Sequence, residues 1–197
     1  GITEVLSMPF SGYELMNALN HSTARYRATA PSAMSRSYVV YSGKGGVGRT
    51  TIAYNTAVAF GQMQGVRVVL IDGDLQFGDL RGLLRVPATA PSILQLPTDR
   101  IAESDLASVL WRDPSGIDLL LAPPRVEQAE MITSRDMEKV ISLLRRIYNV
   151  IVIDSPPAIT DTTLAYLDDA DSILSVITPD RNSVRAARIA GQSFVAA

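Results

Sequence analysis

A glycine-rich segment is the part of this sequence whose residue types and spacing point most directly to chemistry. Residues 42–51 read SGKGGVGRTT and follow the short apolar run 38–41. Glycines at this density let successive backbone N–H groups turn inward around an anion, because no Cβ obstructs the turn. A helix that begins near Arg49 adds the positive end of its dipole, and Thr50 supplies the hydroxyl that such a loop offers to Mg²⁺. The segment therefore predicts a phosphate-binding loop.

Aspartates follow two further apolar runs of the sequence. Asp72 and Asp74 come after the run 66–71, and Asp154 ends the β-branched run 150–153. Ligands of parallel sheets bind at the carboxyl ends of the strands, so both groups are expected at the same edge. Asp72 and Asp74 alone are more typical of an acidic turn. After a phosphate-binding loop in the same series of elements, we interpret all three as a metal and water site.

The elements that must position these residues alternate between strand and helix from Ser37 onward. Strands are predicted at 38–41, 66–71, 117–121, 150–153 and 172–177, and helices at 50–64, at 134–148 and from residue 182 onward. Such alternation predicts an α/β fold with a mostly parallel sheet and helices on both faces. Ser134 is expected to cap the second of these helices, and Asp161 the helix after the strand 150–153.

The sequence divides into three zones. Residues 1–21 contain an amphipathic helix pattern with Leu15 and Leu19 on one face, and residues 22–36 are rich in Ser, Ala, Thr and Arg, which is typical of a linker. Residues 37–197 hold the motifs, and the chain stops in a helix where another strand is expected. We therefore expect a domain that is incomplete at its C-terminus.

Composition excludes several classes of protein. The chain has 197 residues, a net charge of −2 and no cysteine, so disulfides, thiolate metal sites and thiol nucleophiles are excluded. No apolar run reaches the roughly 18 residues of a membrane helix, and the charge balance is unlike that of a dedicated nucleic-acid binder. Of the 18 basic residues only Lys44 and Lys139 are lysine.

The position of the lysine within the glycine-rich segment identifies the kind of loop. A standard P-loop has lysine directly before the threonine, but here Arg49 holds that place and Lys44 lies earlier. KGGxG with an early lysine resembles the deviant Walker A motif of the ParA/MinD family of P-loop ATPases. The resemblance implies ATP and Mg²⁺ as cofactors and a homodimer bridged by ATP, in which Lys44 reaches the phosphates of the partner's nucleotide. Because the fork of Arg49 is not equivalent to an ammonium group, slow hydrolysis is expected.

The same resemblance implies a role for each motif residue. Lys44 and Asp74 are the implied catalytic residues, and Asp74 would orient or deprotonate the attacking water. The implied metal residues are Thr50, Asp72 and Asp154, the two aspartates acting through water. The implied nucleotide-binding residues are Gly43, Lys44, Gly45, Gly46, Val47, Gly48, Arg49, Thr50, Thr51 and, at the adenine, Pro179.

Two segments resemble one branch of that family. Residues 74–79 and 113–124 look like the CpaE/TadZ branch, whose members localise the assembly of Flp/Tad-type pili and carry a receiver-like domain before the ATPase. Residues 1–21 would then be the tail of such a receiver-like domain, although a generic helical linker stays open. The resemblance implies a cytoplasmic protein concentrated at a cell pole, with pilus or secretion assembly proteins or polar landmark proteins as partners.

Three functions stay open at the level of sequence. The first is an ATP-dependent dimerising switch with slow hydrolysis, favoured by the intact acids. The second is a scaffold that binds ATP and does not hydrolyse it, favoured by Arg49 and by Ala158 in the loop after the strand 150–153. The third is a partitioning or positioning ATPase, with Arg185 and Arg188 as the basic residues that could touch DNA.

Overall fold

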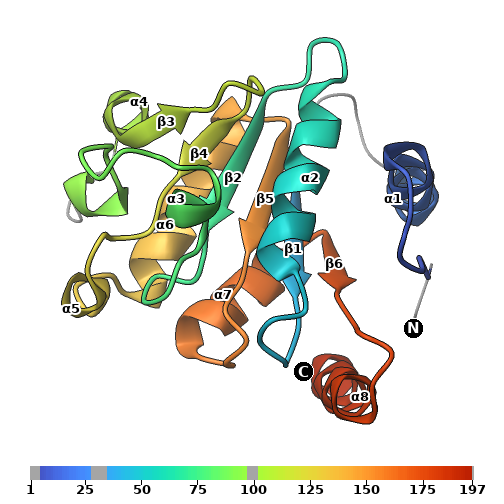
Figure 1. Ribbon diagram of the computed structural model, residues 1–197. Coiled ribbons are helices and arrows are strands. Elements are labelled where there is room, and N and C mark those ends of the chain that lie inside the picture. The colour runs from blue at the N-terminus through green and yellow to red at the C-terminus, as the bar shows by residue number, and fades with distance from the viewer. Residues whose placement is uncertain (1–4, 28–34, 97–101, 197) are drawn as a thin grey trace.

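A six-stranded sheet in the order β3-β4-β2-β5-β1-β6 forms the centre of the computed structural model, which describes residues 5–27, 35–96 and 102–196 (Figure 1). The strands are β1 (Arg36–Tyr41), β2 (Val68–Asp72), β3 (Leu110–Arg112), β4 (Asp118–Leu120), β5 (Val150–Asp154) and β6 (Ser172–Ser175). The pairs are parallel except for β3 with β4, which is antiparallel. The mostly parallel α/β fold predicted from the sequence is confirmed.

The central strands β1, β2 and β5 carry apolar residues at four successive positions because both faces of the sheet are covered. In β1, Tyr38 and Val40 point into one hydrophobic cluster, whereas Val39 and Tyr41 point into the other. β2 and β5 alternate in the same way. Successive side chains of a strand point to opposite faces, so a strand covered on both sides needs an apolar residue at every position.

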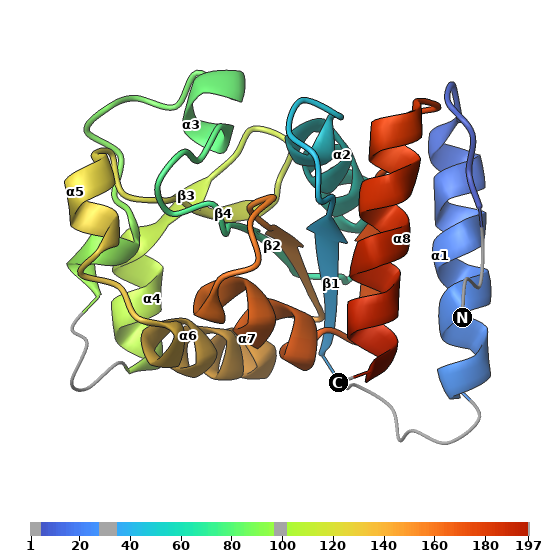
Figure 2. The same ribbon diagram turned by 90° about the horizontal axis from the view of Figure 1, so that it is seen from below.

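Helices lie on both sides of this sheet, as Figure 2 shows for α2 and α3 on one side and for α6 and α7 on the other. The helices are α1 (Gly12–Arg27), α2 (Arg49–Gly61), α3 (Leu80–Leu83), a 3₁₀ turn η1 (Ile93–Gln95), α4 (Glu103–Val109), α5 (Val126–Ala129), α6 (Ser134–Ile147), α7 (Asp161–Asp169) and α8 (Arg181–Ala196). No helix in the described part of the chain is long and apolar enough to cross a membrane.

Both predicted helix caps are wrong by one residue. Thr133, not Ser134, caps α6: its hydroxyl accepts from the Asp136 N–H, and the Asp136 carboxylate accepts from the Thr133 N–H in return. Thr160, not Asp161, caps α7. In each case the capping residue has the extended backbone that the position requires, while its polar neighbour is already helical.

The N-terminal helix packs against the rest of the fold. Leu15 and Leu19 of α1 are buried in the cluster that also holds Ala57 and Phe60 of α2, which confirms the predicted amphipathic helix. α1 continues to Arg27, so the expected linker begins in helix, and residues 28–34 of that linker lie outside the described residues. The assignment of residues 1–21 to a receiver-like domain stays a prediction.

Several short elements were not predicted. They are α3, η1, α4, β3 and α5, none longer than seven residues. In β3, Trp111 is the partner of Leu119 in the register with β4, and it packs half-buried against the cluster of α2. Elements of this length contain too few residues for a hydrophobic period to be recognised.

Arg145, near the end of α6, joins four elements at the edge of the sheet opposite the glycine loop. Its guanidinium donates to both carboxylate oxygens and the carbonyl of Asp169, to Asp171 Oδ2, to Ser37 Oγ and to the Ser35 carbonyl. The side chain is 26% exposed, so these charge-assisted bonds are partly shielded from water. The group fixes the ends of α6 and α7 to the first residues of β1 and β6.

We predict that Arg145→Ala lowers the free energy of unfolding by about 2 kcal/mol, because it leaves two part-buried aspartates without their cation. Urea unfolding followed by circular dichroism measures this loss. Arg146→Ala, which removes the exposed neighbouring arginine, is the matched control and should change stability by less than about 0.5 kcal/mol. Equal losses in the two variants would contradict the role given to Arg145.

Candidate functional site

The glycine loop, residues 42–48, joins the carboxyl end of β1 to the first turn of α2. Gly46 and Gly48 adopt φ values of 73° and 90°, which a side chain would make costly. An ideal Cβ on either would meet no atom within 4 Å, so backbone conformation and not crowding selects glycine there. Gly48 caps α2 without a side-chain hydrogen bond. The loop thus presents the N–H groups of a helix N-terminus, the arrangement that binds phosphate.

Two buried aspartates lie beside this loop. Asp72 and Asp154 are partners in the register of β2 with β5, and they are only 2% and 3% exposed. The Gly73 N–H donates to the Asp154 carbonyl at 2.9 Å, which fastens the ends of the two strands together. The structure therefore brings the carboxylates to one edge of the sheet, as predicted.

The carboxylates of this pair are only partly compensated within the protein. Both oxygens of Asp72 and Oδ1 of Asp154 are buried without a hydrogen-bond partner among the described residues. Burial raises the pKa of Asp154 to about 6, against the lowering effect of the Thr50 hydroxyl and of the Arg49 charge. Burial, and next the negative charge of Asp154, also raise the pKa of Asp72. Such a pair is stabilised by a cation and its bound water, so these residues fit a divalent metal.

These residues fit a metal ion that keeps several of its coordinated water molecules. No group of three His, Cys, Asp or Glu side chains in the described ranges could hold a metal by itself. Mg²⁺ is usually bound by one or two protein ligands together with water and substrate phosphates. Thr50, whose hydroxyl lowers the pKa of Asp154, and the two aspartates match that kind of site.

The loop after β2 folds back over this acidic pair. An ideal Cβ on Gly78 would lie 2.4 Å from Asp72 Oδ2, so no other residue could approach the carboxylate so closely. Asp74, which is half-buried, accepts a hydrogen bond from the Phe77 N–H at 3.0 Å through Oδ1. The loop therefore holds Asp74 beside the metal residues, with one oxygen already engaged. The charge of Asp79 also acts on both buried aspartates.

The basic residues of the glycine loop point in different directions. Arg49 extends back along the loop, with Nη1 3.5 Å from the Ser42 carbonyl. Lys44 instead forms an ion pair with Asp180, its Nζ lying 2.9 Å from Oδ2. Thr51 is exposed on the first turn of α2. The structure thus places Lys44 away from the acidic pair.

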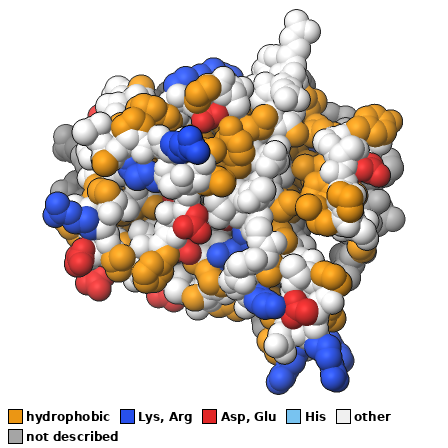
Figure 3. All heavy atoms as spheres, viewed as in Figure 1, with side chains coloured by type: hydrophobic (Ala, Val, Ile, Leu, Met, Phe, Trp, Pro, Cys, Tyr) orange, Lys and Arg blue, Asp and Glu red, His pale blue; other side chains and the backbone are white. Residues whose placement is uncertain are grey.

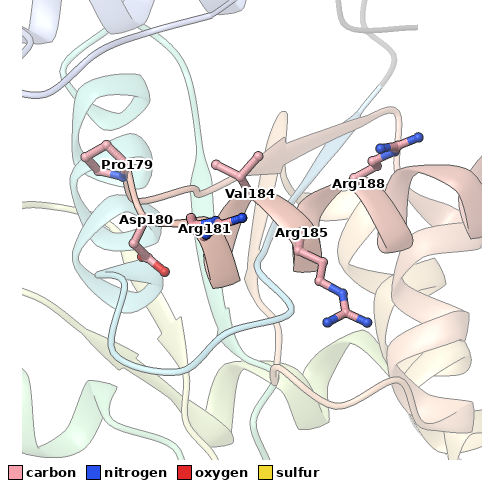
Figure 4. A pocket seen from close by; sticks show the side chains of 6 residues that line it. All are labelled: Pro179, Asp180, Arg181, Val184, Arg185 and Arg188. Carbon is pink, nitrogen blue, oxygen red and sulfur yellow. The ribbon is translucent and has the colours of Figure 1, made fainter.

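Pro179 and the start of α8 border a cavity of about 520 Å³ on the surface. The lining residues are Pro179, Asp180, Arg181, Val184, Arg185 and Arg188, which Figure 4 shows on the first turns of α8 and on the segment just before it. Figure 3 shows basic side chains gathered at the end of the molecule that α8 forms. Pro179 is exposed, as a residue in contact with a ligand must be before binding.

Residues 157 and 158, in the loop after β5, are each held by a hydrogen bond to another element. The Tyr41 hydroxyl donates to the Pro157 carbonyl at 3.4 Å, and the Thr163 hydroxyl donates to the Ala158 carbonyl at 2.8 Å. Together with the fixed φ of two consecutive prolines, these contacts restrict the loop that follows Asp154.

The sequence analysis missed two residues of the site. The motifs of the sequence single out Pro179 and not Asp180, although an aspartate just before a predicted helix is the pattern of an N-terminal cap. Gly78 was noted only as part of a motif, and its close approach to Asp72 depends on the fold of the loop.

Comparison with known proteins decides the family. A family profile described as an AAA domain matches residues 35–189, which is most of the chain. The chain belongs to this family. Among its relatives is the putative septum site-determining protein MinD of Mesostigma viride, 35% identical over 167 residues, which cover 81% of this chain and 56% of the relative. The chain spans a little over half the length of the curated relatives it matches.

Solved structures agree with this assignment. The ParA family ATPase from Chlorobium tepidum TLS has a TM-score of 0.72 at 26% identity, over 80% of this chain and 68% of that one. The septum site-determining protein MinD from Pyrococcus horikoshii OT3, solved in complex with Mg-ADP, has a TM-score of 0.70 at 24% identity, over 81% of this chain and 65% of that one; at this identity it shows the fold alone. The chain is thus a MinD/ParA-type P-loop ATPase domain, as its deviant Walker A motif predicted.

For this MinD/ParA-type domain we predict a penalty from the acidic pair when nucleotide and metal are absent. In the presence of a chelator, Asp154→Asn should raise the free energy of unfolding at pH 7.5 by about 2 kcal/mol, because it removes a buried charge. The measurement is urea unfolding at a series of pH values. Asp168→Asn, on the exposed face of α7, is the control and should have almost no effect.

The sign of the pH dependence follows from the raised pKa. The folded chain holds the Asp154 proton more tightly than the unfolded chain, so protonation stabilises the fold as the pH falls through about 6. The advantage of Asp154→Asn over the wild type is therefore greatest above pH 6 and shrinks toward pH 4. An advantage that stays constant across this range would show that the charge of Asp154 is not the cause.

Proposed function

We propose that this chain is the ATP-binding domain of a dimerising switch that hydrolyses ATP slowly. The observation that carries the proposal is the position of Thr50, Asp72 and Asp154 at one sheet edge, directly beside the glycine loop. Uncompensated buried carboxylates next to a phosphate-binding loop have a clear use when a nucleotide and its cation bind together.

The residues that would hold the nucleotide are those of the glycine loop and the first turn of α2. Backbone N–H groups of residues 43–49 would bind the phosphates, and Arg49 would add its charge. Mg²⁺, bound through Thr50 and through water on the two aspartates, would neutralise phosphate charge. The MinD of Pyrococcus horikoshii, which has the same fold, was solved in complex with Mg-ADP. Pro179 would contact the base.

Asp74 is the residue proposed to act on water. Its Oδ1 is engaged by the Phe77 N–H, so Oδ2 is the oxygen that would accept the proton. The water oxygen then forms a bond to the γ-phosphorus while the bond from phosphorus to the bridging oxygen breaks, which releases ADP and phosphate. The proton of the water passes to Asp74 and from there to the solvent.

Two residues are expected to limit the rate of this step. Arg49 replaces the usual P-loop lysine, and its planar fork cannot occupy the same place as an ammonium group near the β- and γ-phosphates. Ala158 stands in a loop that two prolines and two hydrogen bonds hold in place. We therefore expect ATP binding and dimerisation to be retained better than turnover. The limiting case is a scaffold that binds ATP and does not hydrolyse it.

The finer proposal for the whole protein is a role in the assembly of Flp/Tad-type pili. It is supported by the likeness of residues 74–79 and 113–124 to the CpaE/TadZ branch and by the presence of a helix before the ATPase domain. The partners would be pilus or secretion assembly proteins or polar landmark proteins, at a cytoplasmic pole. A partitioning or positioning role is the alternative, and the exposed arginines of α8 favour it.

We predict that ATP with Mg²⁺ converts the Asp74→Ala protein into a dimer, because binding is retained and hydrolysis is lost. Lys44→Ala in the same background should remain monomeric, since no cation then reaches the partner's phosphates. Sedimentation velocity measures both species, and Lys139→Ala, which removes the other lysine of the chain, is the matched control and should dimerise normally.

Phosphate release by the same proteins separates the switch from the scaffold. The wild type should release phosphate above the background given by Asp74→Ala. Equal rates of phosphate release would favour the scaffold that binds ATP and does not hydrolyse it. A monomeric Asp74→Ala protein at saturating ATP would contradict the proposed dimer.

We also predict that Arg49→Lys raises ATP turnover by roughly tenfold, because single preorganised donors change turnover on that scale or more. A steady-state phosphate assay at saturating ATP measures this. Arg146→Lys is the control, since Arg146 is exposed in the last turn of α6, at the edge of the sheet opposite the glycine loop. Unchanged or lower turnover in Arg49→Lys would show that Arg49 does not limit the reaction.

A further inference from the structure

The ammonium group of Lys44 is engaged within its own chain. Nζ donates to Asp180 Oδ2 at 2.9 Å across 136 residues of sequence, so the pair joins the glycine loop to the start of α8. Each side chain of the pair is 40% exposed. Solvent reaches the pair, and a competing anion has access to Lys44 as well.

Asp180 is preorganised to receive this cation. Its Oδ1 accepts from the N–H groups of Asn182 and Ser183, which fixes the carboxylate at the N-terminus of α8. The Thr178 hydroxyl donates to Oδ2 at 2.6 Å, and the Thr178 N–H donates to Ser183 Oγ. These bonds, that of Thr178 first and that of Lys44 next, hold the pKa of Asp180 well below its usual range. The acid is therefore charged and correctly placed before Lys44 arrives.

The glycine loop also meets α8 at a second point. An ideal Cβ on Gly43 would lie 3.4 Å from the Cβ of Ala186 and 3.8 Å from its carbonyl oxygen. The backbone of the loop thus packs on the second turn of the helix that Asp180 begins, and Figure 4 shows Asp180 at that end of α8. The glycine loop is therefore attached to α8 by the Lys44–Asp180 pair and by the packing of Gly43 on Ala186, and breaking the pair removes the first of these.

We propose that Asp180 holds Lys44 in the monomer and competes for it with the partner's nucleotide. The inference rests on the proposed function, in which Lys44 crosses the dimer interface. Reaching the partner's phosphates takes the ammonium group away from Asp180, so dimer formation must break the pair. The pair therefore raises the ATP concentration at which the dimer forms, and each dimerisation changes how α8 is attached to the loop.

The ion pair of Lys44 with Asp180 is weak enough to break and form again reversibly. A part-exposed ion pair is weak, because water screens its charges and two side chains must be ordered. A triphosphate carries several negative charges, so it can attract the same ammonium group more strongly than one carboxylate does. The exchange needs no rearrangement of Asp180, whose bonds to the first turn of α8 remain.

Lysine acylation tests whether Asp180 engages Lys44 in the monomer, independently of dimer formation. Lys44 and Lys139 are the two lysines of the chain, so mass spectrometry of peptides after limited treatment with acetic anhydride resolves both rates. In nucleotide-free protein, Asp180→Asn should raise the Lys44 rate by about two- to fivefold, the change that an exposed ion pair supports. The Lys139 rate is the internal reference and should stay constant. Asparagine keeps the helix cap and removes the charge.

The second arm measures competition with the nucleotide. In the Asp74→Ala background, Asp180→Asn should lower the ATP concentration for half-maximal dimerisation by about two- to fivefold. Sedimentation velocity across an ATP titration measures this midpoint. Asp168→Asn in the same background changes the net charge equally at the far end of α7 and should leave the midpoint unchanged.

The outcomes separate this inference from the proposed function. Equal rates of Lys44 acylation in Asp180→Asn and wild type overturn the proposal that Asp180 holds Lys44, whatever the result of the dimerisation experiment. Suppose that Asp180→Asn speeds Lys44 acylation but leaves the ATP concentration for half-maximal dimerisation unchanged or higher. This result overturns the proposed competition and does not contradict the proposed dimer. If the Asp74→Ala protein stays monomeric at saturating ATP with either residue at position 180, the proposed function fails and the competition fails with it.

Discussion

The burial of two carboxylates side by side is the constraint on which the rest of this structure depends. Asp72 and Asp154 end the two strands at the centre of the sheet, and neither finds enough partners within the protein. Burial without a partner penalises a charge, so positive groups must be brought to the same place. The N-terminus of α2 and the guanidinium of Arg49 are such groups, and the Thr50 hydroxyl acts in the same direction, but together they compensate the charges only in part.

The same constraint explains where the chain uses glycine next to the acids. At Gly73 an ideal Cβ would lie 2.8 Å from the Asp154 carbonyl oxygen, and at Gly78 it would strike the carboxylate of Asp72. Both glycines let the loop after β2 pass over the acidic pair and bring Asp74 near it. Tyr166 closes this region from below, with its hydroxyl 3.4 Å from the Gly73 carbonyl. A loop with larger residues would have to lie farther from the metal residues.

Much of the fold and part of the site could be predicted because their signals are local. The run 150–153 is β-branched and apolar throughout, and α6 repeats its buried residues at helical spacing, so both elements follow from sequence. β3 could not be predicted, since three residues have no period and its antiparallel pairing depends on β4. The pairing of Lys44 with Asp180 could not be predicted either, because it joins residues 136 positions apart in the sequence. Local patterns gave the residues of the loop, whereas the direction of its lysine required the tertiary structure.

The single tryptophan of the chain has a spectroscopic consequence. Trp111 lies on β3, at the end of the strand order, while β1 and the glycine loop lie near the other end. Emission excited at the red edge of tryptophan absorption therefore reports only on the antiparallel border of the sheet and on its packing against the α2 side. Circular dichroism averages over all the helices. Whether the two signals change together on denaturation would reveal if this border unfolds with the nucleotide-binding half or separately from it.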